Sequence, residues 1–147
     1  KAIVVETEAT DVIEGAKEQT KPQKRAAFVE DSKGFVDTRI ELLQVVYNLS
    51  MVKFDYYPTC EVLLTAMAGG VRYDAYLVDY YMDDAGGILL GSTCTTRILG
   101  LHPGAIVIGQ SSDPLEDEFL RHGARSFVNK RNSEAMAELL RQLLGLP

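Results

Sequence analysis

The sequence predicts a three-layer α/β/α fold in which a doubly wound parallel sheet of five strands is covered by helices on both faces. Short apolar runs alternate with segments whose apolar residues recur at helical spacing, and this alternation repeats five times between residues 26 and 144. Two of the apolar runs end at acids, as strands do at the ligand-binding edge of a parallel sheet. A chain of 147 residues is long enough to form one globular domain.

Five apolar runs mark the strands of this sheet. They are bounded by glycine, proline and polar residues, as buried strands usually are. The first run ends at Glu30 and the third at Asp79. The predicted strands cover residues 26–29, 52–56, 73–78, 105–108 and 126–129.

The helices between the strands are predicted from helical spacing and from residues that begin or end a helix. Pro58 and Pro114 suit a first helical turn, and Asp113 suits the N-cap position before the second of them. In the first helix, Arg39 is predicted to face solvent together with neighbouring acids. The predicted helices cover residues 35–49, 58–68, 87–99, 114–122 and 133–144.

The first 24 residues are predicted to lie outside the folded domain. They contain a strand-like piece at 2–9 and a polar, weakly helical piece at 11–21, and the run 19–25 has one proline and little apolar character. Such a composition is typical of a linker. We therefore predict an N-terminal extension at 1–24 and one domain at 25–147.

Charge and cysteine content narrow the classes of function. The net charge of -6 argues against direct nucleic-acid binding, which needs a basic surface. No apolar run approaches the roughly 20 residues that span a bilayer, and nothing resembles a signal peptide, so we expect a cytoplasmic protein without a membrane segment. Cys60 and Cys94 lie in predicted helices without a paired or metal-binding spacing, and we predict unpaired core residues of a reducing compartment.

The candidate functional residues lie at the ends of the predicted strands. In the strand order 2-1-3-4-5, strands one and three flank the point where the order reverses, so Glu30, Asp31 and Asp79 are expected to meet there. Three carboxylates repel one another unless a cation joins them, and Mg²⁺ prefers oxygen ligands. Strand four adds Ser111 and strand five adds Lys130. Together these groups suit phosphoryl transfer to Asp79.

These residues, in this order at successive strand ends, resemble the receiver domain of two-component response regulators. The resemblance covers about residues 25–145, and it includes the loop from Asp79 through Met82 to Gly87 and the approach to the fifth strand at 123–130. It implies a flavodoxin-like (βα)5 fold with the strand order given above.

The resemblance also implies a role for each site residue. Asp79 would accept the phosphoryl group, and Ser111 and Lys130 would contact its oxygens. Mg²⁺ would be held by the three carboxylates and by the backbone carbonyl of Tyr81. Ser111 and Phe127 would form a switch that responds to phosphorylation, and the domain would catalyse its own slow dephosphorylation.

The implied partners follow from the same resemblance. The phosphodonor would be a sensor histidine kinase or a histidine phosphotransfer protein, and we expect the chain to be cut from a larger protein, such as a hybrid kinase. The face formed by the fourth helix, the fifth strand and the fifth helix would respond to phosphorylation and support a homodimer.

The sequence departs from the usual receiver pattern at several positions. Glu30 stands where Asp is usual, and Asp83 and Arg131 replace prolines, the second of which sets a cis peptide in the family. Two other functions stay open. One is a receiver-shaped interaction module that is never phosphorylated. The other is a phosphatase of the haloacid-dehalogenase type, which needs an acid two residues after its nucleophile, where this chain has Tyr81.

Overall fold

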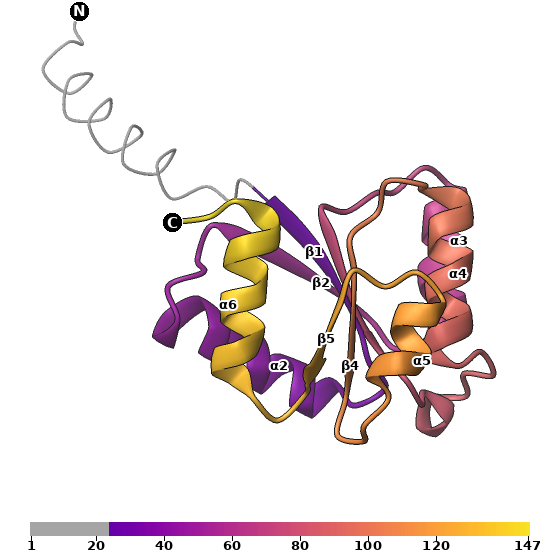
Figure 1. Ribbon diagram of the computed structural model, residues 1–147, viewed down its shortest axis with the longest axis horizontal. Coiled ribbons are helices and arrows are strands. Elements are labelled where there is room, and N and C mark those ends of the chain that lie inside the picture. Colours follow the sequence, from indigo (N-terminus) through magenta and orange to yellow (C-terminus); the bar gives the residue numbers. More distant parts are fainter. Residues whose placement is uncertain (1–23) are drawn as a thin grey trace, which may run out of the picture.

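The computed structural model describes residues 24–147, which form one parallel sheet with helices on both faces (Figure 1). The strand order is β2-β1-β3-β4-β5, as the sequence predicted. The predicted pieces at 2–9 and 11–21 lie outside the described residues. The strands are β1 (Lys24–Val29), β2 (Val52–Tyr57), β3 (Ala75–Asp79), β4 (Val107–Ser111) and β5 (Ser126–Asn129).

Two helices cover one face of the sheet and three cover the other. In Figure 1, α2 and α6 lie on the left of the sheet, and α3, α4 and α5 lie on the right. Each face has its own apolar core, because successive strand residues point to opposite sides. The helices are α2 (Lys33–Glu41), α3 (Cys60–Ala68), α4 (Gly91–Leu101), α5 (Glu116–Arg121) and α6 (Ser133–Leu144).

Alternation along the strands explains why both faces are apolar. In β1, Phe28 packs with α2 and α6, whereas Val29 packs with α3 and α4, and Leu77 and Val78 divide between the two cores in the same way. All four side chains are fully buried. The acids that follow these residues therefore stand at the edge of a sheet whose interior is closed to water.

The first strand begins earlier than predicted. Lys24 and Arg25, which fall in the run 19–25 that was assigned to a linker for its proline and its lack of apolar residues, pair with the start of β2. The Arg25 amide donates to Asp74 at 2.8 Å, and its guanidinium pairs with Asp55 at 2.9 Å. The charged residues belong to the strand because acids from neighbouring segments meet them at its exposed end.

Three helices begin later than predicted. Thr59 caps α3 by accepting from the Val62 amide at 3.2 Å, so Pro58 precedes the helix. Pro114 likewise precedes α5. Helix α4 starts at Gly91, whose amide donates to the Tyr80 carbonyl at 2.8 Å, and a Cβ at this position would collide with the backbone of Asp79. The start of α4 is therefore set by its close approach to the end of β3.

The first helix also differs from the prediction. Helix α2 ends at Glu41 and continues as a π-helical segment, Leu42–Val46. Arg39, predicted to face solvent, is only 7% exposed. It lies three residues after the buried Val36, on the side of α2 that packs against α6, where Arg39 Nη1 lies 3.6 Å from Met136 Sδ. The helical period of α2 places Arg39 on the buried side of the helix. The prediction relied on its charge and therefore placed it in solvent.

The two cysteines are bonded to each other, contrary to the prediction. Cys60 begins α3 and Cys94 lies in α4, and the two residues form a disulfide with their Cα atoms 5.8 Å apart. They are separated by 34 residues in the chain, and only the packing of α3 beside α4 brings them together. The disulfide removes the basis for the predicted reducing compartment. A cytoplasmic location stays a prediction. Between residues 24 and 147, no helix is long and apolar enough to cross a membrane.

Candidate functional site

Three carboxylates meet where β1 and β3 end. The two strands are neighbours in register, with Val29 beside Val78, so the acids that follow them emerge side by side. Oxygen atoms of Glu30, Asp31 and Asp79 lie within 4.8 Å of one another. Glu30 is fully buried and Asp79 is 5% exposed. The structure therefore brings together all three acids that the sequence singled out.

Lys130 reaches this cluster from the end of β5. Its Nζ donates to Glu30 Oε1 at 2.9 Å and to Asp79 Oδ2 at 3.4 Å. Its backbone amide donates to the Ser111 carbonyl at 3.1 Å, which ties the loop after β5 to the end of β4. One ammonium thus contacts two of the three carboxylates.

Burial and neighbouring charges shift the pKa values of the ionisable groups in the acid cluster. Desolvation, followed by the charge of Asp79, raises the pKa of the Glu30 carboxyl. Desolvation also raises the pKa of Asp79, although Lys130 opposes the shift. Desolvation and then Glu30 raise the pKa of Asp31. Burial acts to lower the pKa of Lys130, but its hydrogen bond to Glu30 and the nearby charges outweigh burial and raise it.

The acid cluster fits a hard divalent cation. It offers only oxygen donors, and a single lysine leaves the negative charge uncompensated. Asp31 Oδ2 also accepts from the Asp84 amide at 3.1 Å, so the loop after β3 is tied to a predicted metal ligand. Tyr81 lines the same cavity, but its backbone carbonyl as a ligand stays a prediction.

A cavity of about 220 Å³ opens above the cluster. Ser111, at the end of β4, is 4% exposed, and its Oγ accepts from the Asp113 amide at 3.0 Å. That bond leaves the hydroxyl hydrogen available to a further acceptor. The residues lining the cavity are Asp31, Asp79, Tyr81, Asp83, Asp84, Ser111, Ser112, Asp113 and Lys130.

Phe127 lies in β5, which β4 separates from the strands that carry the acid cluster. It is half-buried in β5, and its ring centre lies 5.8 Å from that of Phe119 in α5. The ring therefore packs between the sheet and α5 rather than into the acid cluster. Ser111 and Phe127 lie in the adjacent strands β4 and β5. The switch that the two residues would form stays a prediction.

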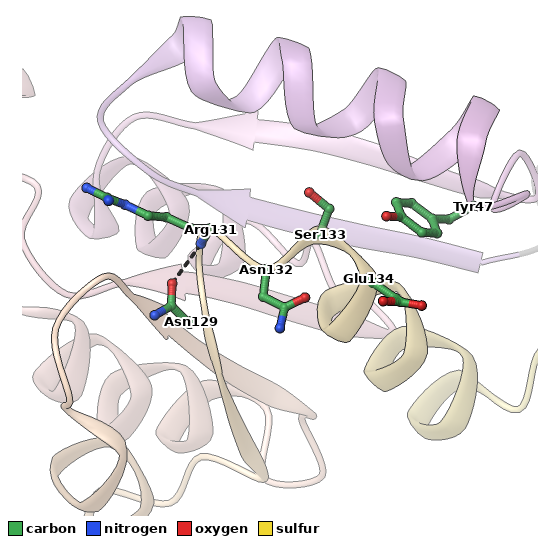
Figure 2. A pocket seen from close by; sticks show the side chains of 6 residues that line it. All are labelled: Tyr47, Asn129, Arg131, Asn132, Ser133 and Glu134. Carbon is green, nitrogen blue, oxygen red and sulfur yellow. Dashed lines mark hydrogen bonds between the residues drawn. The ribbon is translucent and has the colours of Figure 1, made fainter.

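A larger cavity of about 510 Å³ lies at the start of α6 (Figure 2). Figure 2 shows Glu134 near Tyr47, whereas the side chain of Arg131 extends away from both. The Arg131 amide donates to Asn129 Oδ1 at 2.9 Å, and Asn132 caps α6. These side chains shape the loop where receivers usually have proline, and residues 24–147 contain no cis peptide bond. Among the described residues, Glu134 is the one acid that lines this cavity.

Three polar residues near the site were not predicted from the sequence. Gln110 is fully buried beside Asp79 in the register of β3 and β4, and its amide nitrogen and oxygen have no hydrogen-bond partner among the described residues. Glu61 accepts from the Ile88 and Leu89 amides at 2.9 and 3.0 Å and so holds the loop after β3. The third is Arg39. Gln110 follows the predicted fourth strand at 105–108, and it is buried because β4 extends over Val107–Ser111.

Solved structures of known proteins share this architecture. A CheY-like response regulator receiver domain protein from Methanospirillum hungatei is 19% identical, with a TM-score of 0.69 over 83% of this chain and 94% of its own. The receiver domain of NtrX from Brucella abortus is 18% identical, with a TM-score of 0.65 over 83% and 99%. The N-terminal domain of a response regulator/sensory box/GGDEF protein from Carboxydothermus hydrogenoformans is 19% identical, with a TM-score of 0.68 over 83% and 94%.

The likeness is one of three-dimensional structure. No protein-family model matches the sequence, and no curated protein matches it. At identities below 20%, the similarity to these receivers shows the fold alone. That fold includes the strand order that places Glu30, Asp31 and Asp79 together. The chain has the flavodoxin-like fold of response regulator receiver domains.

Proposed function

We propose that this chain is a receiver domain that accepts a phosphoryl group on Asp79 from a histidine kinase or a histidine phosphotransfer protein. The observation that carries the proposal is the position of Asp79, a buried carboxylate at the end of the central strand, with two acids and Lys130 around it. The fold of the chain agrees with this role.

The chemistry needs an oxygen nucleophile and positive charge. A carboxylate oxygen of Asp79 would attack the phosphorus of a phosphohistidine, and the P–N bond would break with its electron pair going to the imidazole, which then takes a proton from solvent. Lys130, 3.4 Å from Asp79 Oδ2, is placed to meet a phosphoryl oxygen. Glu30, Asp31, Asp79 and the Tyr81 carbonyl would hold Mg²⁺, which when bound supplies further positive charge to the phosphoryl oxygens.

The response would pass through Ser111 and Phe127. The Ser111 hydroxyl can donate to a phosphoryl oxygen while keeping the bond from the Asp113 amide. Movement of Ser111 toward Asp79 would open space for Phe127 to turn inward, and packing alone would hold it because the ring has no hydroxyl. We propose that the face formed by α5, β5 and α6 changes as a result and carries partner binding or homodimerisation.

Intact mass tests the proposed function directly. The chain is incubated with Mg²⁺ and a small phosphodonor such as acetyl phosphate, and one added phosphoryl group is expected. The Asp79→Asn variant should gain none, and Asp83→Asn, which alters an exposed acid of the same cavity, should still be labelled. Equal labelling of the Asp79→Asn variant would rule out Asp79 as the acceptor.

A further inference from the structure

Arg39 is a buried cation without an acidic partner in the described part of the chain. Its side chain lies between α2 and α6, and none of the ion pairs formed by residues 24–147 includes it. Burial lowers the pKa of its guanidinium. An unpaired buried charge destabilises a folded protein, because desolvation is not offset by an ion pair. Ion pairing within the described residues therefore gives no reason for an arginine here.

Phe35 connects Arg39 to the phosphorylation site. The Arg39 Cζ lies 4.8 Å from the centre of the Phe35 ring, and the Lys130 Nζ lies 5.0 Å from the same centre. The two cations are therefore no more than about 10 Å apart. The ring also packs edge-on against Phe28 at 6.3 Å. Both cations therefore lie against an aromatic ring, and charges act over longer distances in such surroundings than in water.

Phosphorylation would change the charge that these cations face. A carboxylate at Asp79 carries one negative charge, whereas a phosphoryl group carries about two near neutral pH. Lys130 is already shared between Glu30 and Asp79. In residues 24–147, Arg39 is the buried cation that this arrangement leaves without a carboxylate.

We propose that Arg39 is a second cation of the phosphorylation site, which stabilises the negative charge of phosphorylated Asp79 from a distance without touching it. This inference rests on the proposed receiver function. Arg39 is thus a positioning residue that acts through its field on Lys130 and on the acid cluster. The same positive field opposes the arrival of a metal cation.

Two opposite effects follow for the Arg39→Met variant. Methionine keeps the length of the side chain and its packing against Met136, but removes the charge. Asp79 Oδ2 lies no more than about 13 Å from Arg39 Cζ, and two unit charges at that distance in an effective dielectric of about 20 interact with an energy that corresponds to about tenfold in affinity. We expect Mg²⁺, which carries two charges, to bind more tightly by at least that factor, and beryllofluoride, a phosphoryl mimic, to bind more weakly at saturating Mg²⁺.

The experiment compares four forms of the chain: the unaltered protein, Arg39→Met, Arg39→Lys and Arg97→Met. Arg97 is an exposed residue of α4 on the opposite face of the sheet, so its loss changes the net charge equally without changing the site. Mg²⁺ affinity is measured by calorimetry without phosphodonor, beryllofluoride affinity at saturating Mg²⁺, and labelling rate with acetyl phosphate. Thermal unfolding without metal should show Arg39→Met at least as stable as the unaltered chain.

Opposite shifts of the two affinities in Arg39→Met, with Arg39→Lys and Arg97→Met close to the unaltered chain, support the inference. Weakening of both ligands would show that Arg39 only supports the local structure, and no change in either would show that its field does not reach the site. Both results overturn the inference. If the unaltered chain is labelled but the two affinities of Arg39→Met do not shift in opposite directions, only this inference fails. If the unaltered chain takes no phosphoryl group, the proposed function fails with it.

Discussion

Lys130 lies closer to Glu30 than to Asp79. The ammonium is 2.9 Å from Glu30 Oε1 and 3.4 Å from Asp79 Oδ2, and Glu30 is fully buried. In the unphosphorylated protein Glu30 is thus the main partner of the lysine. The longer side chain of Glu30, which stands where Asp is usual in receivers, explains how it reaches the ammonium. A phosphoryl group on Asp79 would have to draw Lys130 away from this contact.

Loss of Lys130 should therefore affect both stability and labelling. We expect Lys130→Ala to lower the free energy of unfolding at neutral pH by about 2–3 kcal/mol, because it leaves the buried Glu30 without its counter-ion. Labelling by acetyl phosphate should become much slower. Urea unfolding and intact mass measure the two effects.

An exposed ion pair provides the control for this prediction. Lys33 pairs with Asp37 at 2.8 Å, and both side chains are mostly exposed, at 69% and 60%. Lys33→Ala should change the free energy of unfolding by less than about 0.5 kcal/mol. Equal losses in the two variants would show that Lys130 does not hold a buried charge.

Asp31 should matter more for Mg²⁺ than the length of the Glu30 side chain. Asp31→Asn removes one charged oxygen ligand, and Mg²⁺ affinity should fall at least tenfold, on the order of the loss of one charged contact. Glu30→Asp keeps the charge, and its affinity should change little. Calorimetric titration with Mg²⁺ compares the two, with Glu61→Gln as a control acid that bonds the loop amides rather than the cluster. Unchanged affinity in Asp31→Asn would contradict the assigned site.

Ser111→Ala should separate phosphorylation from the change in shape. The nucleophile and the acid cluster remain, so labelling of Asp79 should continue. Without the hydroxyl, the phosphoryl group cannot draw the end of β4 toward it, and Phe127 should stay packed against Phe119. Amide chemical shifts with and without beryllofluoride measure the response of residues 111–130. The same response in the variant and the unaltered chain would show that Ser111 does not couple phosphorylation to the change in shape.

Stability without metal should depend on pH in a direction set by the raised carboxyl pKa values. Burial raises the pKa of Glu30 and Asp79 above their values in the unfolded chain. The folded state therefore holds protons more tightly, and the stability present below the ordinary carboxyl pKa of about 4 is lost as the pH rises through the raised values. Mg²⁺ affinity should rise over the same range, since the metal binds the ionised acids.

The Asp79→Asn variant isolates this effect from other titrating groups. Asparagine cannot ionise, and it also removes the charge that raises the pKa of Glu30. The free energy of unfolding of the unaltered chain, measured by urea between about pH 4 and pH 7 with a chelator present, should fall relative to that of the variant. A difference that is flat or grows with pH would mean that the acids ionise freely in the folded state.

Local patterns in the sequence were sufficient for the order of the elements and for the site. Apolar runs and helical spacing reflect burial within a few residues, so the five strands and the acids at the ends of β1 and β3 could be read directly, whereas β4 continues past its predicted end to Ser111. Strand order was taken from the common five-stranded arrangement of doubly wound sheets, which the resemblance to receivers implies, and the structure has that order. Asp31 and Lys130 reach the cluster because each follows a strand end without an intervening element.

Only the tertiary structure decided which distant residues meet. Cys60 and Cys94 are bonded because α3 and α4 pack together on one face of the sheet, and no spacing in the chain encodes that contact. Arg39 points inward because the helical period of α2 and the position of α6 outweigh its charge. Helix α4 starts at Gly91 because the backbone of β3 passes too close for a side chain. Each depends on the separation between elements, which is set by packing and not by the local sequence.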